Sequence, residues 1–362
     1  MPLIAATVLA IILVAGIISL INSIPYSIRT IYKYSETMLG LGPRGDPTLT
    51  PHIVEWVSTH SPVKLDRVVG CRVSPSQVKS IVGKWPFVVL GFEPSDMDYF
   101  LRRLDVTGIS GRLPLSGKPE AVVSEPVARN LGLHLGSELL GPDKNESYSP
   151  NSVRVVGIVK TELWTMFTSF DYLKENHFPP VNVALAFAQN KSEQSTLDHW
   201  AANTFKGNRA QIFAYFQIEK QTNEMFKTLY KILNVVIGVL VLDVTFMMGM
   251  LINIFQGQRL VEFGLLQAIG FTKKQLMKRM FGETFIVVVL GWIIGVFLAF
   301  VGLIVAKKVL MDPSAYALNL FDTQAFAYTL VVPVAVLVAG ALTIASRFRK
   351  FDPVGIVERR LV

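Results

Sequence analysis

The stretch QGQRLVEFGLLQAIGFTKKQLMKRMFGE, residues Gln256–Glu283, decides the fold of this 362-residue chain. It lies between two apolar runs, Ile232–Phe255 and Phe285–Val305, and each run is long enough to cross roughly 30 Å of hydrocarbon. The stretch holds five basic residues against two acidic ones. Because short basic loops between spans stay in the cytoplasm, the pattern predicts a membrane protein with this loop inside the cell.

The loop also has an apolar pattern with helical spacing. A helix here would gather one apolar face, made of Leu260, Phe263, Leu265, Leu266, Ile269, Leu276 and Met280. Gly270 and Thr272 are typical of a helix end followed by a new N-cap. We therefore expect two short helices joined by a turn, with an apolar face that a partner protein covers.

The string VEFGLLQAIGFTKKQL within this loop resembles the cytoplasmic coupling motif of FtsX-like/MacB-like ABC-transporter permeases, the type VII or mechanotransmission class. In that family the pattern R-x-x-E-[IF]-G-x-L-[RQ]-A-I-G-[AF]-[ST]-[KR] follows the second span. The matching positions are Arg259, Glu262, Gly264, Leu266, Ala268, Ile269, Gly270, Thr272 and Lys273. The resemblance implies that these residues, Ala268 and Thr272 aside, couple the chain to an ATPase. The competing interpretation is a solvated amphipathic linker.

The composition agrees with several spans and one soluble part. The chain is 51% hydrophobic and 17% charged, with a mean hydropathy of +0.43, whereas soluble domains have about 25% charged residues. The net charge of +8 is concentrated next to the spans, which favours anionic lipid headgroups over nucleic acid as the partner. With Cys71 as its single cysteine, the chain forms no intramolecular disulfide.

The predicted fold is an α-helical membrane protein with four transmembrane helices and a large α+β extracytoplasmic domain inserted between the first and second helices. Both termini are expected in the cytoplasm. The first span is interpreted as uncleaved, because it has neither a basic n-region nor a small-residue cleavage site. The expected parts are span 1 (1–26), the extracytoplasmic domain (27–224), a stalk with span 2 (225–255), the coupling loop (256–283), span 3 (284–306), an outer loop (307–322), span 4 (323–346) and a basic tail (347–362).

The extracytoplasmic domain shows alternating strand and helix signals. Strands are expected at Val68–Val73, Phe87–Phe92 and Ala121–Ser124, and helices at His52–Ser58, Ser95–Leu104 and Glu125–Leu131. The segment GRLPLSGKPEAVVSEPVARNLGLHLGSELL, followed by VRVVGIVK, resembles the extracytoplasmic domain of the same permease family (a MacB-like periplasmic core domain). The charged segment Gln217–Lys231 is predicted to run as a continuous helix into span 2.

The chain carries no pattern for catalysis, nucleotide binding or metal binding. A phosphate-binding loop needs glycines at fixed offsets before Lys and Ser or Thr, and none occurs. The five histidines are scattered, without a zinc-binding motif. We therefore expect a non-catalytic subunit with no cofactor of its own. The resemblance implies that ATP and Mg²⁺ are bound by a partner ATPase.

Three features of the spans are further candidates. Asp243 lies inside span 2, where a charged group costs several kcal/mol. Two interpretations stay open: a gating or substrate-proximal group, or a protonated hydrogen-bonding group at a dimer seam. Gly291 and Gly295 form a GxxxG that permits close helix packing. Pro333 is expected to kink span 4.

The favoured function is the permease subunit of an ABC transporter in the cytoplasmic (inner) membrane. As the resemblance implies, a separate dimeric ABC ATPase would drive extracytoplasmic conformational change in this chain and a second permease protomer, identical or not. The result would be export or extraction of a lipophilic, peptide or lipoprotein substrate. Other expected partners are membrane lipids and an extracytoplasmic protein, but no nucleic acid. One alternative is an FtsX-type regulator that activates a cell-wall hydrolase without transport; another is a membrane-anchored enzyme or receptor.

Overall fold

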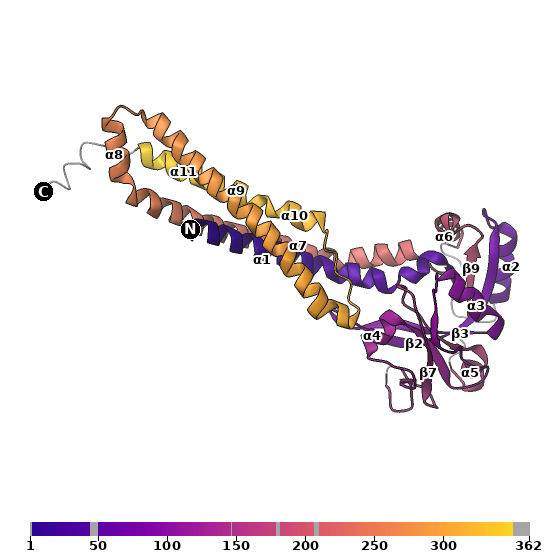
Figure 1. The fold of residues 1–362 in the computed structure, drawn as a ribbon. Coiled ribbons are helices and arrows are strands. Elements are labelled where there is room, and N and C mark those ends of the chain that lie inside the picture. The colour runs from indigo at the N-terminus through magenta and orange to yellow at the C-terminus, as the bar shows by residue number, and fades with distance from the viewer. Residues whose placement is uncertain (1, 44–49, 146, 179–181, 206–209, 350–362) are drawn as a thin grey trace. The chain divides into compact units, whose positions relative to one another are not determined.

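The computed structural model describes residues 2–43, 50–145, 147–178, 182–205 and 210–349 (Figure 1). The chain divides into two compact units. The membrane unit comprises Met1–Ser23, Lys227–Lys307 and Leu318–Val362, and the sheet unit comprises Ile24–Phe226 and Lys308–Ala317. The expected domain 27–224 thus corresponds closely to the sheet unit, which also takes in most of the expected outer loop.

Four helices among the described residues are long and apolar enough to cross a membrane, as the sequence predicts. The apolar stretches are Leu3–Ile31, Tyr215–Phe255, Lys273–Ser314 and Thr323–Ser346. The corresponding helices are α1 (Pro2–Ile31), α7 (Tyr215–Gln258), α9 (Lys273–Ala306), and the pair α10 (Thr323–Thr329) and α11 (Val331–Arg349). Figure 1 shows α8 (Leu260–Ala268) at the turn from α7 to α9.

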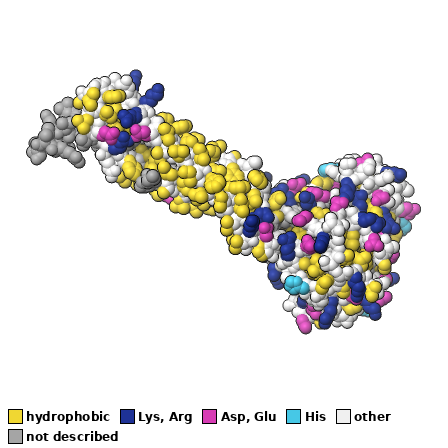
Figure 2. Space-filling view, in the orientation of Figure 1, with side chains coloured by type: hydrophobic (Ala, Val, Ile, Leu, Met, Phe, Trp, Pro, Cys, Tyr) yellow, Lys and Arg dark blue, Asp and Glu magenta, His cyan; other side chains and the backbone are white. Residues whose placement is uncertain are grey.

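A shared apolar core holds the membrane unit together. Ile11 and Val14 of α1, Val244 of α7, Val288 of α9 and Val336 of α11 are all buried in one cluster. Their neighbours on the opposite helix faces are exposed apolar side chains, as in Figure 2, where hydrophobic side chains cover this surface. Such an outward apolar surface is what a hydrocarbon environment requires.

The two glycines of span 3 pack against α1. A Cβ on Gly291 would lie 2.9 Å from Cβ of Thr7, and one on Gly295 would lie 2.7 Å from Cβ of Ile11. Both separations are below ordinary van der Waals contact, so only glycine fits. The GxxxG therefore brings two helices of this chain into close contact.

The last span is broken before its proline, where the sequence predicts a kink. Helix α10 ends at Thr329, α11 begins at Val331, and Pro333 follows in its first turn. Proline has no N–H to donate to the carbonyl four residues earlier, which here belongs to Thr329. The chain continues because the Leu330 carbonyl accepts the Val334 N–H at 3.3 Å.

The sheet unit is built on one ten-stranded mixed sheet. The order is β10-β1-β9-β2-β3-β8-β5-β7-β4, and β6 pairs with β7. Two pairs, β3 with β8 and β5 with β7, are parallel, and the other pairs along the sheet are antiparallel. The strands are β1 (Leu39–Pro43), β2 (Leu65–Ser80), β3 (Gly83–Phe92), β4 (Ile109–Gly111), β5 (Glu120–Ser124), β6 (Glu138–Leu140), β7 (Val153–Val159), β8 (Met166–Ser169), β9 (Asn182–Ala188) and β10 (Ala210–Phe213).

Residues along each strand alternate between two cores, as a pleated strand requires. Val89 and Val123 belong to one core, whereas Leu90, Val122 and Phe167 belong to the other. The first core is covered by α4 (Glu125–Leu131) and α5 (Phe170–Glu175), and the second by α3 (Pro94–Arg103). A third core lies under α2 (Thr50–His60) and α6 (Gln194–Thr204).

Short helical turns complete the sheet unit. These are η1 (Lys33–Thr37), η3 (Lys191–Glu193), the π-helical turn η4 (Lys307–Met311) and η5 (Asp312–Ser314). The buried side chain of Asn130 on α4 donates a hydrogen bond of 2.8 Å to the carbonyl of Ser314. The expected outer loop is therefore fixed to the sheet unit by its backbone.

Candidate functional site

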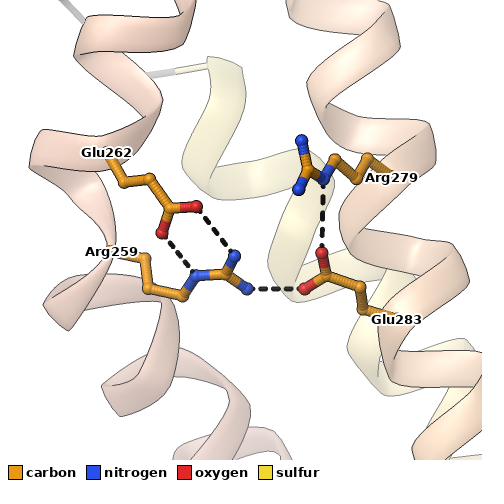
Figure 3. Close-up of polar contacts among 4 residues, drawn as sticks. All are labelled: Arg259, Glu262, Arg279 and Glu283. Carbon is orange, nitrogen blue, oxygen red and sulfur yellow. Dashed lines mark hydrogen bonds and ion pairs between the residues drawn. The ribbon is translucent and has the colours of Figure 1, made fainter.

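The candidate site is the corner at which α7 turns through α8 into α9. Arg259 stands between the first two helices, and its guanidinium joins all three through carboxylates (Figure 3). Nε and Nη2 donate to the two oxygens of Glu262 on α8, at 2.8 and 3.0 Å. Nη1 donates to Glu283 on α9 at 2.5 Å, and Arg279 donates to the other oxygen of Glu283 at 3.4 Å.

This network is stronger than a single surface ion pair. A planar guanidinium that binds two carboxylates at once fixes direction as well as charge. The hydrogen bonds that Arg259 donates to Glu262, followed by the one to Glu283, raise the pKa of Arg259 above its already high ordinary value. The same bond from Arg259 lowers the pKa of Glu262. The network thus holds α8 at a defined angle to α9.

The turn after α8 has the geometry that the sequence predicts for Gly270. Its φ is +107°, which a residue with a Cβ adopts only with strain. The Gly270 N–H bonds the Gln267 carbonyl at 3.0 Å, and the Phe271 N–H bonds the Leu266 carbonyl at 3.1 Å. These two bonds form a Schellman motif, which closes the carbonyl end of α8.

The next helix starts in a capping box. Thr272 Oγ1 accepts the backbone N–H of Gln275, and the Gln275 side chain accepts the backbone N–H of Thr272. From Lys273 the helix runs to Ala306 without a break. The expected second short helix is therefore the first three turns of α9, because nothing between Lys273 and Glu283 interrupts helical hydrogen bonding.

The predicted single apolar face is divided in two by the folded corner. One half packs inside the membrane unit, where Phe263 of α8 and Leu276 and Met280 of α9 form a cluster with Ile344 and Phe348 of α11. The other half points outward, with Ile269 76% exposed and Leu265 59% exposed. The prediction that these residues share one face is wrong, because α8 and α9 meet at a turn and only their facing sides bury each other.

The outward half forms an apolar tip that we define as Leu265, Ile269 and Phe271. All three side chains are exposed at the end of α8. Leu265 and Ile269 are four residues apart and therefore share one helix face. Lys273, Lys274 and Lys278 are exposed nearby in the chain on α9. Figure 2 shows charged side chains gathered at this end of the membrane unit. An exposed apolar tip with basic neighbours is suited to a protein partner.

The remaining predicted coupling residues support the corner from inside. Gly264 is buried in α8, and Leu266 is partly buried against the Phe263 cluster. The side chain of Leu260, part of the predicted face, lies outside the described side chains. Most of the expected basic tail, residues 350–362, lies outside the described residues.

Sequence reasoning missed three contributors to the corner. Glu283 and Arg279 appear in the sequence as loop charges, but Glu283 pairs both with Arg259, 24 residues away, and with Arg279. Phe348 packs against Phe263 with ring centroids 5.9 Å apart and the rings tilted by 51°, from a helix more than 80 residues later. The spacing of Arg279 and Glu283, four residues apart on one helix, was the available signal for a pair.

Asp243 lies on an exposed face of α7 in the membrane unit. Val239, Leu242 and Phe246 around it are exposed apolar residues. No hydrogen bond or ion pair joins Asp243 to another described residue. Among the described residues there is also no group of three metal-binding side chains.

A family model for the FtsX-like permease C-terminal domain matches residues 234–353. Residues 234–353 form an FtsX-like permease domain. The match contains the whole corner, α8 included, with the third and fourth spans. The match agrees with the resemblance carried by the coupling motif. Together with the four apolar helices, it indicates a membrane protein with a permease domain.

Solved structures that resemble part of the chain are domains of transporter and permease proteins. The extracellular domain of the noncanonic ABC-type transporter YknZ, from Gram-positive bacteria, is 14% identical and has a TM-score of 0.29; the alignment covers 49% of this chain and 99% of that one. The periplasmic region of MacB from Actinobacillus actinomycetemcomitans is 11% identical and has a TM-score of 0.29; the alignment covers 52% of this chain and 92% of that one. A domain of a putative permease from Porphyromonas gingivalis is 12% identical and has a TM-score of 0.25; the alignment covers 49% of this chain and 89% of that one. No curated protein sequence matches the chain.

Proposed function

We propose that this chain is the permease subunit of an ABC transporter. A separate ATPase drives it and docks on the apolar tip of Leu265, Ile269 and Phe271. The observation that carries the proposal is the exposed apolar tip on a helix whose angle is fixed by Arg259. A partner that covers the tip buries the exposed side chains of Ile269 and Leu265, and this burial favours binding. Because α8 is held by Arg259 to α9, and packs on α9 and α11, a force on the tip reaches both spans.

ATP and Mg²⁺ belong to the ATPase in this proposal. The chain's own residues supply the docking surface, and two routes for motion toward the sheet unit. One route is α9, which is continuous from Lys273 to Ala306. The other is α7, a single helix of 44 residues that begins in the sheet unit and ends at the corner. The charged segment Gln217–Lys231, predicted to run as a continuous helix into span 2, lies within it, without a proline or glycine.

The proposed orientation places both termini and α8 in the cytoplasm and the sheet unit outside. Its support is the basic charge of the corner and tail. An impermeant maleimide should label a cysteine at Lys191 of the sheet unit in intact cells. Labelling of a cysteine at Lys273 under the same conditions would contradict the orientation.

The proposed complex contains a second permease protomer. Asp243 is exposed on α7 among apolar side chains, and a carboxylate that faces hydrocarbon is costly. Coverage by the second protomer would give Asp243 a hydrogen-bond partner. Transport of a lipophilic, peptide or lipoprotein substrate is the proposed outcome. Activation of a cell-wall hydrolase without transport is the alternative, and a hydrolase captured with the complex would favour it.

Co-purification with the ATPase tests the proposal. The full chain is tagged in its native membrane, and captured proteins are identified by mass spectrometry. Wild type should retain an ABC ATPase, and Ile269→Asp should reduce the recovery at least tenfold, because it places a charge in the buried anchor. Val82→Asp is the matched control, since Val82 is an exposed apolar residue of the sheet unit. Equal recovery with Ile269→Asp and wild type would overturn the docking assignment.

A further inference from the structure

A cavity of about 390 Å³ lies inside the sheet unit, between one face of the sheet and the first turns of α7. Val73, Leu90, Val183 and Leu185 form its floor, on the strand face that shares the core under α3. Ile218, Thr222 and Met225 of α7 form its roof. Their spacing of four and three residues puts them on one helix face. The volume lies in the usual range for small-molecule sites, about 300–1,000 Å³.

The lining is uncharged throughout. None of its residues is Asp, Glu, Lys, Arg or His. One wall is aromatic and consists of Tyr32, Tyr34, Trp85 and Phe87, with Pro86 beside them. A phosphate, a carboxylate or a cation in this cavity would lose its hydration without an opposite charge, which is costly. The occupant must therefore have a neutral, mainly apolar body.

Three polar groups at the cavity are not satisfied by described residues. The Thr222 side chain is 3% exposed, and its hydroxyl makes no hydrogen bond to them. Trp85 Nε1–H is buried and has no acceptor in hydrogen-bonding geometry. Burial raises the pKa of the Tyr32 hydroxyl to about 12, and the nearby Trp85 indole partly counteracts this rise. The Tyr34 hydroxyl also lacks a partner there, and burial raises its pKa.

Buried polar groups normally have hydrogen-bond partners, so these three need an explanation. Tyr32 shows the contrast, because its hydroxyl donates to the Pro86 carbonyl at 2.6 Å. An occupant with an acceptor oxygen would accept hydrogen bonds from the N–H of Trp85 and from the hydroxyl of Thr222 or Tyr34. An ester or amide carbonyl on an apolar chain has this chemistry.

The mouth of the cavity is apolar as well. Met225 and Phe213, which line it, are exposed large side chains. Along α7, Met225 comes seven residues before Ile232, where the apolar run of span 2 begins. Seven residues of helix correspond to about 10 Å. This segment of α7 therefore lies about two helical turns from residues predicted to be in the membrane, which favours a lipid source over a soluble small molecule.

We infer that this cavity binds an acyl chain through its hydrocarbon, with the ester or amide carbonyl held by Trp85 and Thr222. The carrier is a membrane phospholipid or a lipidated polypeptide, since both present the same chain and carbonyl. The inference concerns the sheet unit alone and does not depend on the ATPase docking proposed above.

Photo-cross-linking of the full chain in nanodiscs tests the inference, without nucleotide or partner. The probe is a phosphatidylcholine with a diazirine on one acyl chain, and the labelled peptides are identified by mass spectrometry. Label should appear in the spans and also in peptides that contain Trp85 or Leu185, which face the cavity. Label confined to the spans would overturn the inference.

Variants separate the cavity from the surrounding lipid. Met225→Trp fills the mouth and should reduce cavity label at least threefold, with span label unchanged. Asn223→Trp adds the same ring to an exposed α7 residue that does not line the cavity, and it should leave both labels unchanged. Trp85→Phe keeps the wall but removes the N–H, and about a fivefold weaker label is expected for one lost hydrogen bond of about 1 kcal/mol. Equal cavity label in Met225→Trp and Asn223→Trp would contradict the site.

Competition identifies the source of the chain. A diacylated lipopeptide and an unlabelled phospholipid are added separately against the photo-probe. Displacement by the lipopeptide at lower concentration would assign a lipidated polypeptide, and the reverse would assign a membrane lipid. If neither reduces the cavity label, acyl-chain binding is disproved.

Discussion

The sheet unit and the corner around α8 differ in how they treat apolar residues. In the sheet unit, alternate residues of each strand enter one of several closed cores, so that Val122 and Val123 are both fully buried on opposite sides. At the corner, Phe263 is buried but Ile269, six residues later, is 76% exposed. The sheet unit is complete within one chain, apart from its cavity. In the proposed function, another protein on the tip completes the corner.

The comparison also separates two uses of charge. The sheet unit uses an ion pair locally: Arg112 donates to both oxygens of Glu120, at 2.6 and 2.5 Å, next to the turn at Gly111. At the corner, Arg259 joins three helices through Glu262 and Glu283. Loss of the first pair would loosen one turn, whereas loss of the second would free α8 from α9.

If the sheet unit is self-contained, a steric change in it should unfold it and leave the membrane unit in place. Gly111 has a φ of +94°, and a Cβ there would lie 2.2 Å from the Val156 carbonyl oxygen. Gly111→Val should therefore destabilise the sheet unit by about 3 kcal/mol or more. Limited proteolysis of the full chain should then cut within residues 50–205 and spare the spans.

Gly70→Ala is the matched control, because no atom lies within 4 Å of the added methyl group. It should leave the proteolysis pattern unchanged. Resistance of Gly111→Val at the wild-type level would show that β4 can move aside, and the close packing described for this turn would then be incorrect.

A smaller effect is expected from pH in the sheet unit. Burial raises the pKa of Asp198 to about 7, against a hydrogen bond from Gln194 that lowers it. The folded state therefore holds a proton that the unfolded state releases near pH 4, so stability falls as pH rises from about 4 to about 7. An asparagine at this position does not ionise, so Asp198→Asn avoids this fall in stability. The variant should be more stable than wild type by about 2 kcal/mol at pH 8.

Thermal unfolding of the full chain in detergent at pH 5 and pH 8 measures the difference. The gain of Asp198→Asn should be larger at pH 8 than at pH 5. A gain of equal size at both values would mean that Asp198 is ionised in the folded protein throughout, which contradicts the burial of its carboxyl group.

The smallest expected effect concerns Asp243 on α7. Asp243→Asn keeps a hydrogen-bonding group, and assembly with the second protomer should be unchanged. Asp243→Leu removes it and should weaken assembly by about 1 kcal/mol. Sedimentation of the complex in detergent measures both. Full assembly combined with lost transport in Asp243→Asn would show instead that the carboxyl group acts in gating.

Much of this architecture follows from the sequence, because its signals are local. Hydrocarbon thickness alone places the four spans. A positive φ at Gly270 and an N-cap at Thr272 follow from side-chain chemistry within a few residues. Strands β3, β5 and β7 coincide with short β-branched runs, and α4 has the predicted limits of Glu125 and Leu131.

What the sequence could not supply depends on contacts between distant residues. Strand β2 extends to Ser80 through Pro75, past the predicted end at Val73, because β3 supplies a hydrogen-bonding partner along its length. The inner strand β9 was not predicted; its run VALAFA is as compatible with a buried helix as with a strand. At the corner, periodicity identifies Ile269 and Phe263 as apolar positions but cannot say which one the turn at Gly270 leaves exposed.

The central claim is that binding of ATP to a partner at the α8 tip moves the sheet unit. A spin label on Lys174→Cys, an exposed position of α5, with a second label on the other permease protomer measures this motion directly. Cys71 is buried, so the introduced cysteine is the reactive one. In nanodiscs with the ATPase, ATP should shift the distance between the labels by several ångströms in wild type and should leave it unchanged in Ile269→Asp. An equal shift in both proteins would contradict the claim.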